Sequence, residues 1–422
     1  MNRNNMQHFQ YQLGELYGEK VPLAKIAEQY GTPCYIYSKQ AIIEAFKAFS
    51  LALQRYTCPH QINYAVKANS NLAFLNILVQ QSAGFDIVSQ GELERVLKAG
   101  GKASKVVFSG VGKSVPELTS ALKAGIGCFN VESLSEVLRL NEIAKQLNIP
   151  ANIALRVNPD VAADSHPYIS TGLKENKFGV HLNQALEFYL TAQQLSHINI
   201  RGIAFHIGSQ ITTLDPFVAA LNKVLKFIEV LKKSGIHLEH INIGGGLGLR
   251  YLDEKPPTPV EYIDTVMQYL KDSELEVHIE PGRAIAAHAG VLLTRLEYIK
   301  DNFAIVDASM NDLLRPALYE SYHEIIPVQP HSQGLQAIYD IVGPVCETSD
   351  FLGKARHLCL KEGDLLAVLS AGAYGFSMSS NYNSRPRAAE IMIDHNQFHL
   401  VRPRESLIDL FDSEKLFNRL TD

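Results

Sequence analysis

The sequence predicts a (β/α)8 barrel followed by a mostly β domain. Eight short apolar runs alternate with helical patterns, and they begin near residues 61, 84, 105, 127, 151, 200, 237 and 276. Near-continuous apolar strands that alternate with helices are typical of a parallel sheet buried on both faces. Eight equivalent units favour a closed barrel over a doubly wound open sheet, which is the alternative. From about residue 285 the alternation gives way to β-like runs separated by turn residues, which indicates a second, β-rich domain. These runs are VLLTRLEYIK, NFAIVDAS, HEIIPVQ, QAIYDIVGPV, DLLAVLSAGAY and EIMIDHNQFHLV.

Three segments follow from this pattern. Residues 1–36 form a lead-in that we assign to the β domain, residues 37–284 the barrel, and residues 285–422 the β-rich domain. Within the lead-in, the β-like run 33–37 could add a strand to the β domain. Ser38 could cap a helix over 39–53. Between the barrel strands, helical patterns fall at 91–99 and 115–124, among others.

Composition excludes several classes of protein. A chain of 422 residues with 46% hydrophobic and 20% charged residues is ordinary for a globular enzyme of two domains. A net charge of −5 predicts no binding to nucleic acid or to an anionic membrane. No apolar run has the length of a membrane span, and the first residues lack the apolar segment of a secretory signal. Five scattered cysteines without a Cys-x-x-Cys pair argue against disulfides and zinc, and for a reducing cytosol.

Polar residues follow the predicted barrel strands at their carboxyl ends. Barrel enzymes build their active sites at this rim. The residues are Lys67, Asp86, Ser109, Glu132, Arg156, His206, Gly244 to Gly246 and Glu280. Lys67 closes the first strand and is either a surface lysine or an amine held in a pocket, ready to form a Schiff base.

Two motifs indicate the kind of ligand. The glycine run 244–248 follows the seventh strand, where barrels frequently bind phosphate; a tight turn is the alternative. Its spacing does not match a dinucleotide fingerprint, and the Gly-Lys-Ser at 112–114 lacks the first glycine of a P-loop. Glu280 and Arg283 follow the eighth strand. They are either a surface ion pair, or the Glu280 carboxylate keeps the nitrogen of a bound pyridine ring protonated. His206 could lie against such a ring or be structural.

One further segment, HPYISTGLKENKFG at 166–179, reads as a long loop after the fifth strand. Long loops within compact domains are usually functional.

Read together, the motifs YAVKAN, HIGSQ, GGGLG, EPGR and CETSD resemble the fold-type III pyridoxal-phosphate decarboxylases, and most of all the diaminopimelate decarboxylases. The resemblance extends from about Tyr35 to Arg387. The segment FSGVGKS is a looser match than the others.

The resemblance implies a role for each position. Lys67 would carry pyridoxal phosphate as a Schiff base, with His206 on its ring and Glu280 on its pyridinium nitrogen. Further cofactor contacts would come from Asp86, Ser209, Gly244, Gly245, Gly246, Gly282, Arg283 and Tyr374. Substrate would be held by Arg283, Arg315, Tyr319, Glu347 and Tyr374. Cys346 would protonate the product. In the family, Cys346, Glu347 and Tyr374 belong to a site shared across a head-to-tail homodimer.

These residues favour meso-2,6-diaminopimelate as the substrate, with L-lysine and carbon dioxide as products. Arg315 or Arg283 suits a second carboxylate, and Glu347 suits a second ammonium group. A decarboxylase of ornithine, arginine or carboxynorspermidine is the nearest alternative. A racemase is disfavoured by Glu280, since a strong electron sink is a liability when only a proton moves. A non-catalytic pyridoxal-phosphate-binding protein would not need Cys346.

Overall fold

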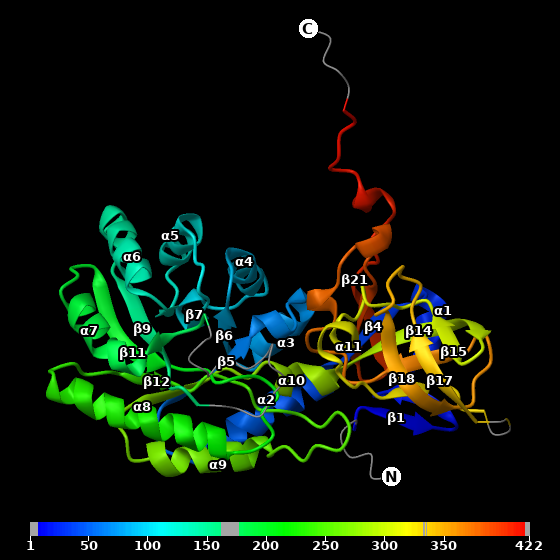
Figure 1. The fold of residues 1–422 in the computed structure, drawn as a ribbon, viewed down its shortest axis with the longest axis horizontal. Coiled ribbons are helices and arrows are strands. Elements are labelled where there is room, and N and C mark those ends of the chain that lie inside the picture. The colour runs from blue at the N-terminus through cyan, green and yellow to red at the C-terminus, as the bar shows by residue number, and fades with distance from the viewer. Residues whose placement is uncertain (1–6, 162–176, 332–333, 335, 418–422) are drawn as a thin grey trace, which may run out of the picture. The chain divides into compact units, whose positions relative to one another are not determined.

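The computed structural model describes residues 7–161, 177–331, 334 and 336–417. It divides into two compact units (Figure 1). One consists of residues 41–286, and the other of residues 1–40 together with 287–422. Most of the predicted long loop at 166–179 lies outside the described residues.

The first unit contains the predicted barrel. Its eight parallel strands run in the order β9-β11-β12-β13-β5-β6-β7-β8, and pairing of β8 with β9 closes the ring. The strands are β5 (His60–Ala65), β6 (Gly84–Ile87), β7 (Val106–Phe108), β8 (Cys128–Val131), β9 (Ala151–Asn158), β11 (Ile198–Ala204), β12 (His240–Asn242) and β13 (Glu276–Ile279). A two-residue strand, β10 (Val180–His181), pairs with β9 in addition. All eight predicted barrel strands are therefore confirmed.

Helices alternate with these strands and cover the outside of the barrel (Figure 1). They are α2 (Lys39–Leu53), α3 (Leu72–Gln80), α4 (Gln90–Lys98), α5 (Val115–Ala124), α6 (Leu134–Leu147), α7 (Leu182–Gln193), α8 (Asp215–Lys233) and α9 (Pro259–Leu270). A short helix, α10 (Arg283–Ala286), follows β13. Several begin at residues whose side chains accept a first-turn N–H, such as Ser89, Ser133 and Thr258. The predicted helices at 39–53, 91–99 and 115–124 are confirmed as α2, α4 and α5.

The second unit is a mixed β-sheet domain with the strand order β18-β17-β15-β14-β4-β20-β21. Strand β16 pairs with β19, which pairs with β14. The strands are β4 (Cys34–Ser38), β14 (Gly290–Lys300), β15 (Phe303–Val306), β16 (Ile325–Pro327), β17 (Ala337–Val342), β18 (Phe351–Leu358), β19 (Leu365–Val368), β20 (Ala389–Asp394) and β21 (Gln397–Arg402). Since β4 lies between β14 and β20, the prediction that an N-terminal strand joins the β domain is confirmed.

Parts of this unit differ from the prediction or go beyond it. The lead-in contains a three-stranded sheet of β1 (Phe9–Gln12), β2 (Glu15–Gly18) and β3 (Val21–Pro22), followed by α1 (Leu23–Tyr30). A tight Leu13-Gly14 turn, with both residues at positive φ, joins β1 to β2. Strand β18 was not predicted. At the start of α2 the Glu19 carboxylate accepts hydrogen bonds from the Ser38 hydroxyl and from the Gln40 N–H, so a residue distant in sequence binds the first turn of the helix.

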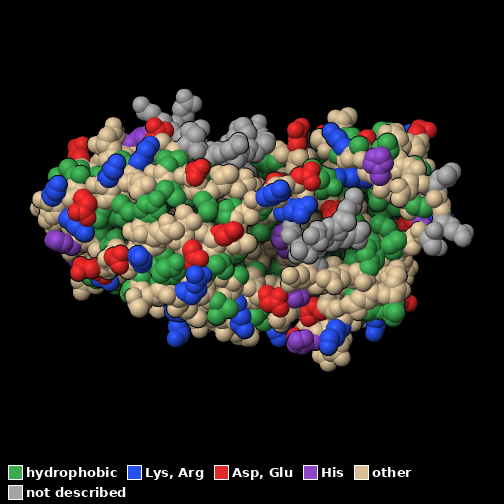
Figure 2. Space-filling view, turned by 90° about the horizontal axis from the view of Figure 1, so that it is seen from below, with side chains coloured by type: hydrophobic (Ala, Val, Ile, Leu, Met, Phe, Trp, Pro, Cys, Tyr) green, Lys and Arg blue, Asp and Glu red, His purple; other side chains and the backbone are tan. Residues whose placement is uncertain are grey.

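The surface fits the modest net charge. On the face shown in Figure 2, acidic and basic side chains of the described residues are interspersed. Among the described residues, the helices lack the length and apolarity that crossing a bilayer requires.

Candidate active site

Lys67 lies in a 3-10 turn, Val66–Ala68, directly after β5. Its Nζ is 3.1 Å from Oδ2 of Asp86, which belongs to the neighbouring strand β6. The Asp86 side chain is fully buried, whereas 39% of the Lys67 side chain is exposed. A buried carboxylate therefore holds an accessible amine at the rim of the barrel.

The amine opens into a cavity of about 360 Å³ at the carboxyl ends of the strands. A cavity of this size is within the range of small-molecule sites. Its lining is drawn from most of the barrel strands and the turns that follow them: Lys67, Asp86, Val88, Ser109, Gly110, Val111, Asn130, Arg156, Phe178, Ala204, Phe205, His206 and Glu280. The structure thus brings together Lys67, Asp86, His206 and Glu280, as the sequence predicts.

Glu280 follows β13 and is held by two amides. Asn242 Nδ2 donates to its Oε1 at 2.5 Å, and Asn130 Nδ2 lies 3.4 Å from the same oxygen. Burial raises the pKa of Glu280 to about 7, and the negative charge of Asp86 adds to the rise. Lys67 and the Asn242 hydrogen bond oppose it. A cationic partner for Glu280 would therefore be well placed.

His206 follows β11 and receives a hydrogen bond from the glycine run. The Gly245 N–H donates to its Nδ1 at 3.2 Å, so this nitrogen is the acceptor and Nε2 carries the proton of the neutral ring. Burial, together with the positive charges of Arg156 and Lys67, lowers the pKa of His206 well below its usual range. The ring is therefore a neutral, flat wall of the cavity.

The glycine run after β12 comes too close to neighbouring strands for side chains. A Cβ at Gly245 would collide with the carbonyl oxygen of Glu280, and one at Gly246 with that of Gly208. Gly244 and Gly246 also have positive φ values of 69° and 107°. Backbone amides can approach an anion closely along such a segment.

Arg283, at the start of α10, is 7% exposed. Its Nη2 donates to Ser209 Oγ at 2.9 Å, and its Nη1 donates to the Tyr251 hydroxyl at 3.0 Å. Ser209 and Arg283, both predicted, thus meet at one point, and Tyr251 joins them.

Two buried ion pairs lie near the carboxyl ends of β8 and β9. Arg156 Nη1 donates to Glu132 Oε1 at 3.1 Å, and the Arg156 guanidinium lies 4.8 Å from the centre of the Phe178 ring. The Lys113 amine contacts Glu136 Oε1 at 2.6 Å and donates to the carbonyl of Asn130 at 2.7 Å. Lys113, which belongs to the Gly-Lys-Ser segment that does not match a P-loop, therefore fixes the end of β8 that contains Asn130.

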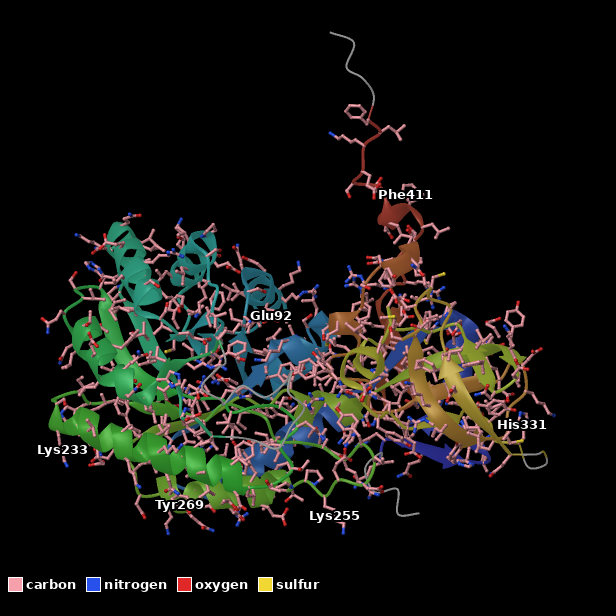
Figure 3. The ribbon with its side chains drawn as sticks, viewed as in Figure 1. Glu92, Lys233, Lys255, Tyr269, His331 and Phe411 are labelled. Atoms are coloured by element: carbon pink, nitrogen blue, oxygen red, sulfur yellow. The ribbon has the colours of Figure 1, made fainter. Side chains whose placement is uncertain are left out.

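Glu92 is an unpredicted titratable group at this rim. It belongs to α4 (Figure 3), and its Oε2 accepts the N–H of Val88, a residue of the cavity wall, at 2.7 Å. Burial raises the pKa of Glu92 to about 7, although that hydrogen bond and the charge of Lys67 oppose the rise.

The cavity residues fit the cofactor that the sequence resemblance implies. Two buried acceptors on it, Asp86 Oδ1 and Asn130 Oδ1, lack a hydrogen-bond partner within the described part of the chain. Buried acceptors without donors are rare because they are costly. Asp86 and Glu280 make the cavity wall acidic. A bound heteroaromatic group with a protonated ring nitrogen would supply a positive charge and a hydrogen-bond donor to this wall. The glycine run would suit its phosphate.

The remaining predicted residues belong to the β-sheet unit. Arg315 begins α11 (Arg315–Tyr319), is 4% exposed, and places Nη1 2.8 Å from His323 Nε2. Tyr319 ends the same helix. Cys346 and Glu347 are exposed; Asn383 accepts the Cys346 N–H, and the Tyr382 hydroxyl donates to Glu347 Oε1 at 2.8 Å.

Tyr374 has a positive φ of 55° between buried Ala373 and Gly375. A non-glycine residue with this backbone is uncommon and is often found at functional sites.

The sequence did not single out Glu92, Asn130, Asn242, Tyr251, Phe178 or His323. For Asn130 and Asn242 a signal existed, because each lies at or next to the carboxyl end of a predicted strand. Tyr251 follows the glycine run closely. No sequence pattern indicates Glu92 or His323, because their contacts depend on the packing of a helix and a loop in the folded chain.

Comparison with known proteins agrees with the geometry. The model for the pyridoxal-binding domain of pyridoxal-dependent decarboxylases matches residues 39–287. The chain is 55% identical to a diaminopimelate decarboxylase of Vibrio cholerae, over 97% of this chain and 99% of that one. It is 43% identical to the solved diaminopimelate decarboxylase of Helicobacter pylori complexed with L-lysine, with a TM-score of 0.89 and coverage of 92% and 98%. The solved diaminopimelate decarboxylase of M. jannaschii is 36% identical, with a TM-score of 0.93 and 98% coverage of both chains. The chain therefore belongs to the diaminopimelate decarboxylases, within the pyridoxal-phosphate-dependent decarboxylases.

Proposed function

We propose that this chain decarboxylates meso-2,6-diaminopimelate to L-lysine and carbon dioxide, with pyridoxal phosphate bound in the barrel cavity. Membership of the family supports the reaction. The observation that carries it is the meeting of Lys67, Asp86, His206 and Glu280 around one cavity. Covalent capture of an aldehyde requires an accessible lysine amine, and Lys67 offers one to the cavity.

The barrel residues would bind and orient the cofactor. Lys67 would hold its aldehyde carbon, and the glycine run, Ser209 and Arg283 would hold its phosphate, with Tyr374 as a further contact. Pyridoxal phosphate supplies an electron sink for the carbon that loses carbon dioxide. Gly282 is suited to close packing here, since a Cβ at this position would press on Ala65.

Two groups of the wall would control the charge of the site. Glu280, whose pKa is raised to about 7, would gain a cationic partner and keep the ring nitrogen protonated. His206 is neutral, so it can lie against a ring without adding a positive charge. This arrangement favours decarboxylation over racemisation, because full protonation of the ring nitrogen strengthens the electron sink.

The β-sheet unit would supply most of the substrate contacts. Arg315 of this unit, or Arg283 of the barrel, suits the distal carboxylate, and Glu347 suits the distal ammonium. Tyr319 and Tyr374 would complete the pocket. Cys346 would donate the proton that replaces the lost carboxylate. We also propose a homodimer in which Cys346 and Glu347 serve the partner's barrel; their exposure supports this. The five free cysteines support a cytosolic location.

One assay tests the reaction. Carbon dioxide release is measured from meso-diaminopimelate, L-ornithine, L-arginine and carboxynorspermidine, with and without added pyridoxal phosphate. Release from meso-diaminopimelate alone, dependent on cofactor, is expected. Preferential release from another substrate would overturn the proposed specificity.

The attachment site has its own test. Borohydride reduction of the holoenzyme, followed by peptide mass spectrometry, should place the adduct on Lys67. Lys113 is the internal control, since its amine is buried in an ion pair. An adduct on any other lysine would mean that Lys67 does not carry the cofactor.

A further inference from the structure

The surroundings of Arg315 contain an unusual contact. Arg315 and His323 are both buried, at 4% and 0% exposure, and Arg315 Nη1 lies 2.8 Å from His323 Nε2. On the other side of the ring, His323 Nδ1 lies 2.8 Å from the carbonyl oxygen of Leu369. An arginine beside a histidine would be repulsive if both were charged, so the contact needs an explanation.

The chemistry of the three groups admits one protonation state. A carbonyl oxygen only accepts hydrogen bonds, so His323 Nδ1 must donate. A guanidinium only donates, so His323 Nε2 must accept from Arg315. His323 is therefore a neutral imidazole whose proton is fixed on Nδ1 by Leu369. Protonation of Nε2 would set one N–H against another and add a like charge.

The backbone around His323 is fixed as well. Arg356 Nη2 donates to the His323 carbonyl at 3.0 Å, and the Arg356 guanidinium lies 3.9 Å from the centre of the Tyr322 ring. The Leu369 N–H donates to the carbonyl of Glu324 at 2.8 Å. The ring and the segment 322–324 are thus tied to β18 and to the residue after β19, which leaves His323 little freedom.

We propose that His323 is a positioning residue for Arg315: it orients the guanidinium for the distal carboxylate of the substrate, and so sets the preference for substrates that carry one. This rests on the proposed function, in which Arg315 binds that carboxylate. A neutral acceptor suits the task because it orients the guanidinium and leaves its positive charge available to the substrate. A carboxylate at the same place would neutralise that charge. Preorganised donors bind a carboxylate with less loss of side-chain freedom.

Two amide variants of His323 form a matched test. The amide of His323→Asn overlaps the Nδ1 side of the ring, so it can still donate to Leu369 but does not reach Arg315. The longer His323→Gln reaches the Nε2 position and can accept from Arg315. Inhibition of the holoenzyme is measured with L-lysine and with cadaverine, which differ only in the carboxylate.

His323→Asn should raise KM for meso-diaminopimelate and weaken inhibition by L-lysine, each about tenfold, as expected for loss of a hydrogen bond to a charged group. Inhibition by cadaverine, cofactor absorbance and kcat at saturation should change less than about twofold. His323→Gln should restore most of the loss. Arg315→Ala should show the same selectivity as His323→Asn, but more strongly.

Four outcomes decide the matter. Normal L-lysine inhibition in His323→Asn, with its loss in Arg315→Ala, would make His323 merely structural. Equal weakening by both inhibitors would also overturn the proposal, as would failure of His323→Gln to recover. If wild-type protein released no carbon dioxide from meso-diaminopimelate, the proposed function would fail instead. Direct binding of L-lysine and cadaverine, followed by calorimetry, would then still report on Arg315 and His323.

Discussion

At the scale of the residue, Glu280 carries opposing influences on one carboxyl group. Burial and Asp86 raise its pKa, while Lys67 and the hydrogen bond from Asn242 lower it, and the result is about 7. Without a cationic partner, such a group is partly protonated at neutral pH. A protonated ring nitrogen beside it would restore the carboxylate, so the site is adapted to a cationic ligand.

Replacement of Glu280 by Gln should therefore separate binding from turnover. The amide keeps the size of the side chain and can still accept from Asn242, so cofactor should stay bound. Turnover should fall by roughly 100-fold, because the ring nitrogen loses its ionic partner and the electron sink weakens. Cofactor absorbance and kcat are measured on the same preparation.

Glu276→Gln is the matched control, since Glu276 is at the opposite end of the same strand, β13. Its kcat should equal that of wild type. An unchanged kcat in Glu280→Gln would exclude the role that we assign to Glu280.

At the scale of the element, β12 and β13 bring two histidines together inside the barrel wall. The rings of His240 and His278 are stacked with centres 4.5 Å apart and an angle of 11° between their planes. The His240 ring occupies the space that a side chain at Gly202 would need. Burial lowers the pKa of His240 to about 3, and His278 and Arg201 contribute, while Glu276 opposes the shift.

This pair predicts a loss of stability in mild acid. The pKa of His240 is about 3 in the folded chain and about 6.5 when unfolded. The unfolded chain therefore binds a proton first as the pH falls, and stability from the neutral ring is present above pH 6.5 and is lost toward pH 3. At pH 5 the loss amounts to about 2 kcal/mol. Urea unfolding at pH 7 and pH 5 measures it.

His240→Phe keeps a flat ring against Gly202 and His278 but cannot titrate. Its free energy of unfolding should fall by about 2 kcal/mol less than that of wild type between pH 7 and pH 5. If the free energy of unfolding of His240→Phe depended on pH as that of wild type does, His240 would not be the cause of the acid sensitivity.

The turn after β7 gives a second test at this scale. Lys113 and Glu136 are 1% and 9% exposed at their side chains and lie 2.6 Å apart, and Lys113 also binds the carbonyls of Gly110 and Asn130. Lys113→Met would leave the Glu136 carboxylate buried without its partner, at a cost of about 3–5 kcal/mol. The free energy of unfolding in urea measures this cost.

Glu136→Gln in the Lys113→Met background removes the unpaired charge and should recover part of the loss. If the double variant were as unstable as the single one, the ion pair would not be the cause, and the carbonyl contacts of Lys113 would carry the stability.

At the scale of the whole molecule, local sequence pattern predicted most of the fold and several residues of the cavity lining. The barrel strands are continuous apolar runs because both their faces are buried, so they could be predicted from the sequence. β18 was not, because only Leu352, Gly353 and Leu358 among its residues are buried and no simple alternation results. The rim residues Lys67, Asp86, His206 and Glu280 were found from their places at strand ends. His323 and Glu92 act through contacts that form only when the chain folds, and a single sequence does not reveal these contacts.

The last prediction concerns the placement of Lys67 and Cys346 in different units. The lysine that would carry the cofactor belongs to the barrel, whereas Cys346 belongs to the β-sheet unit and is exposed. A two-fold dimer can exchange such elements reciprocally and so build two equivalent shared sites. The alternative is that Cys346 serves the barrel of its own chain.

Mixing two inactive variants distinguishes these arrangements. Lys67→Ala and Cys346→Ala should each be nearly inactive alone. If sites are shared, random reassociation makes half of the dimers hybrid, and one site of each hybrid contains both native residues while the other contains neither. Activity should then recover to about a quarter of wild type. If each site belongs to a single chain, no site in any dimer is complete, so a mixture in which native mass spectrometry proves subunit exchange would stay inactive and exclude the shared site.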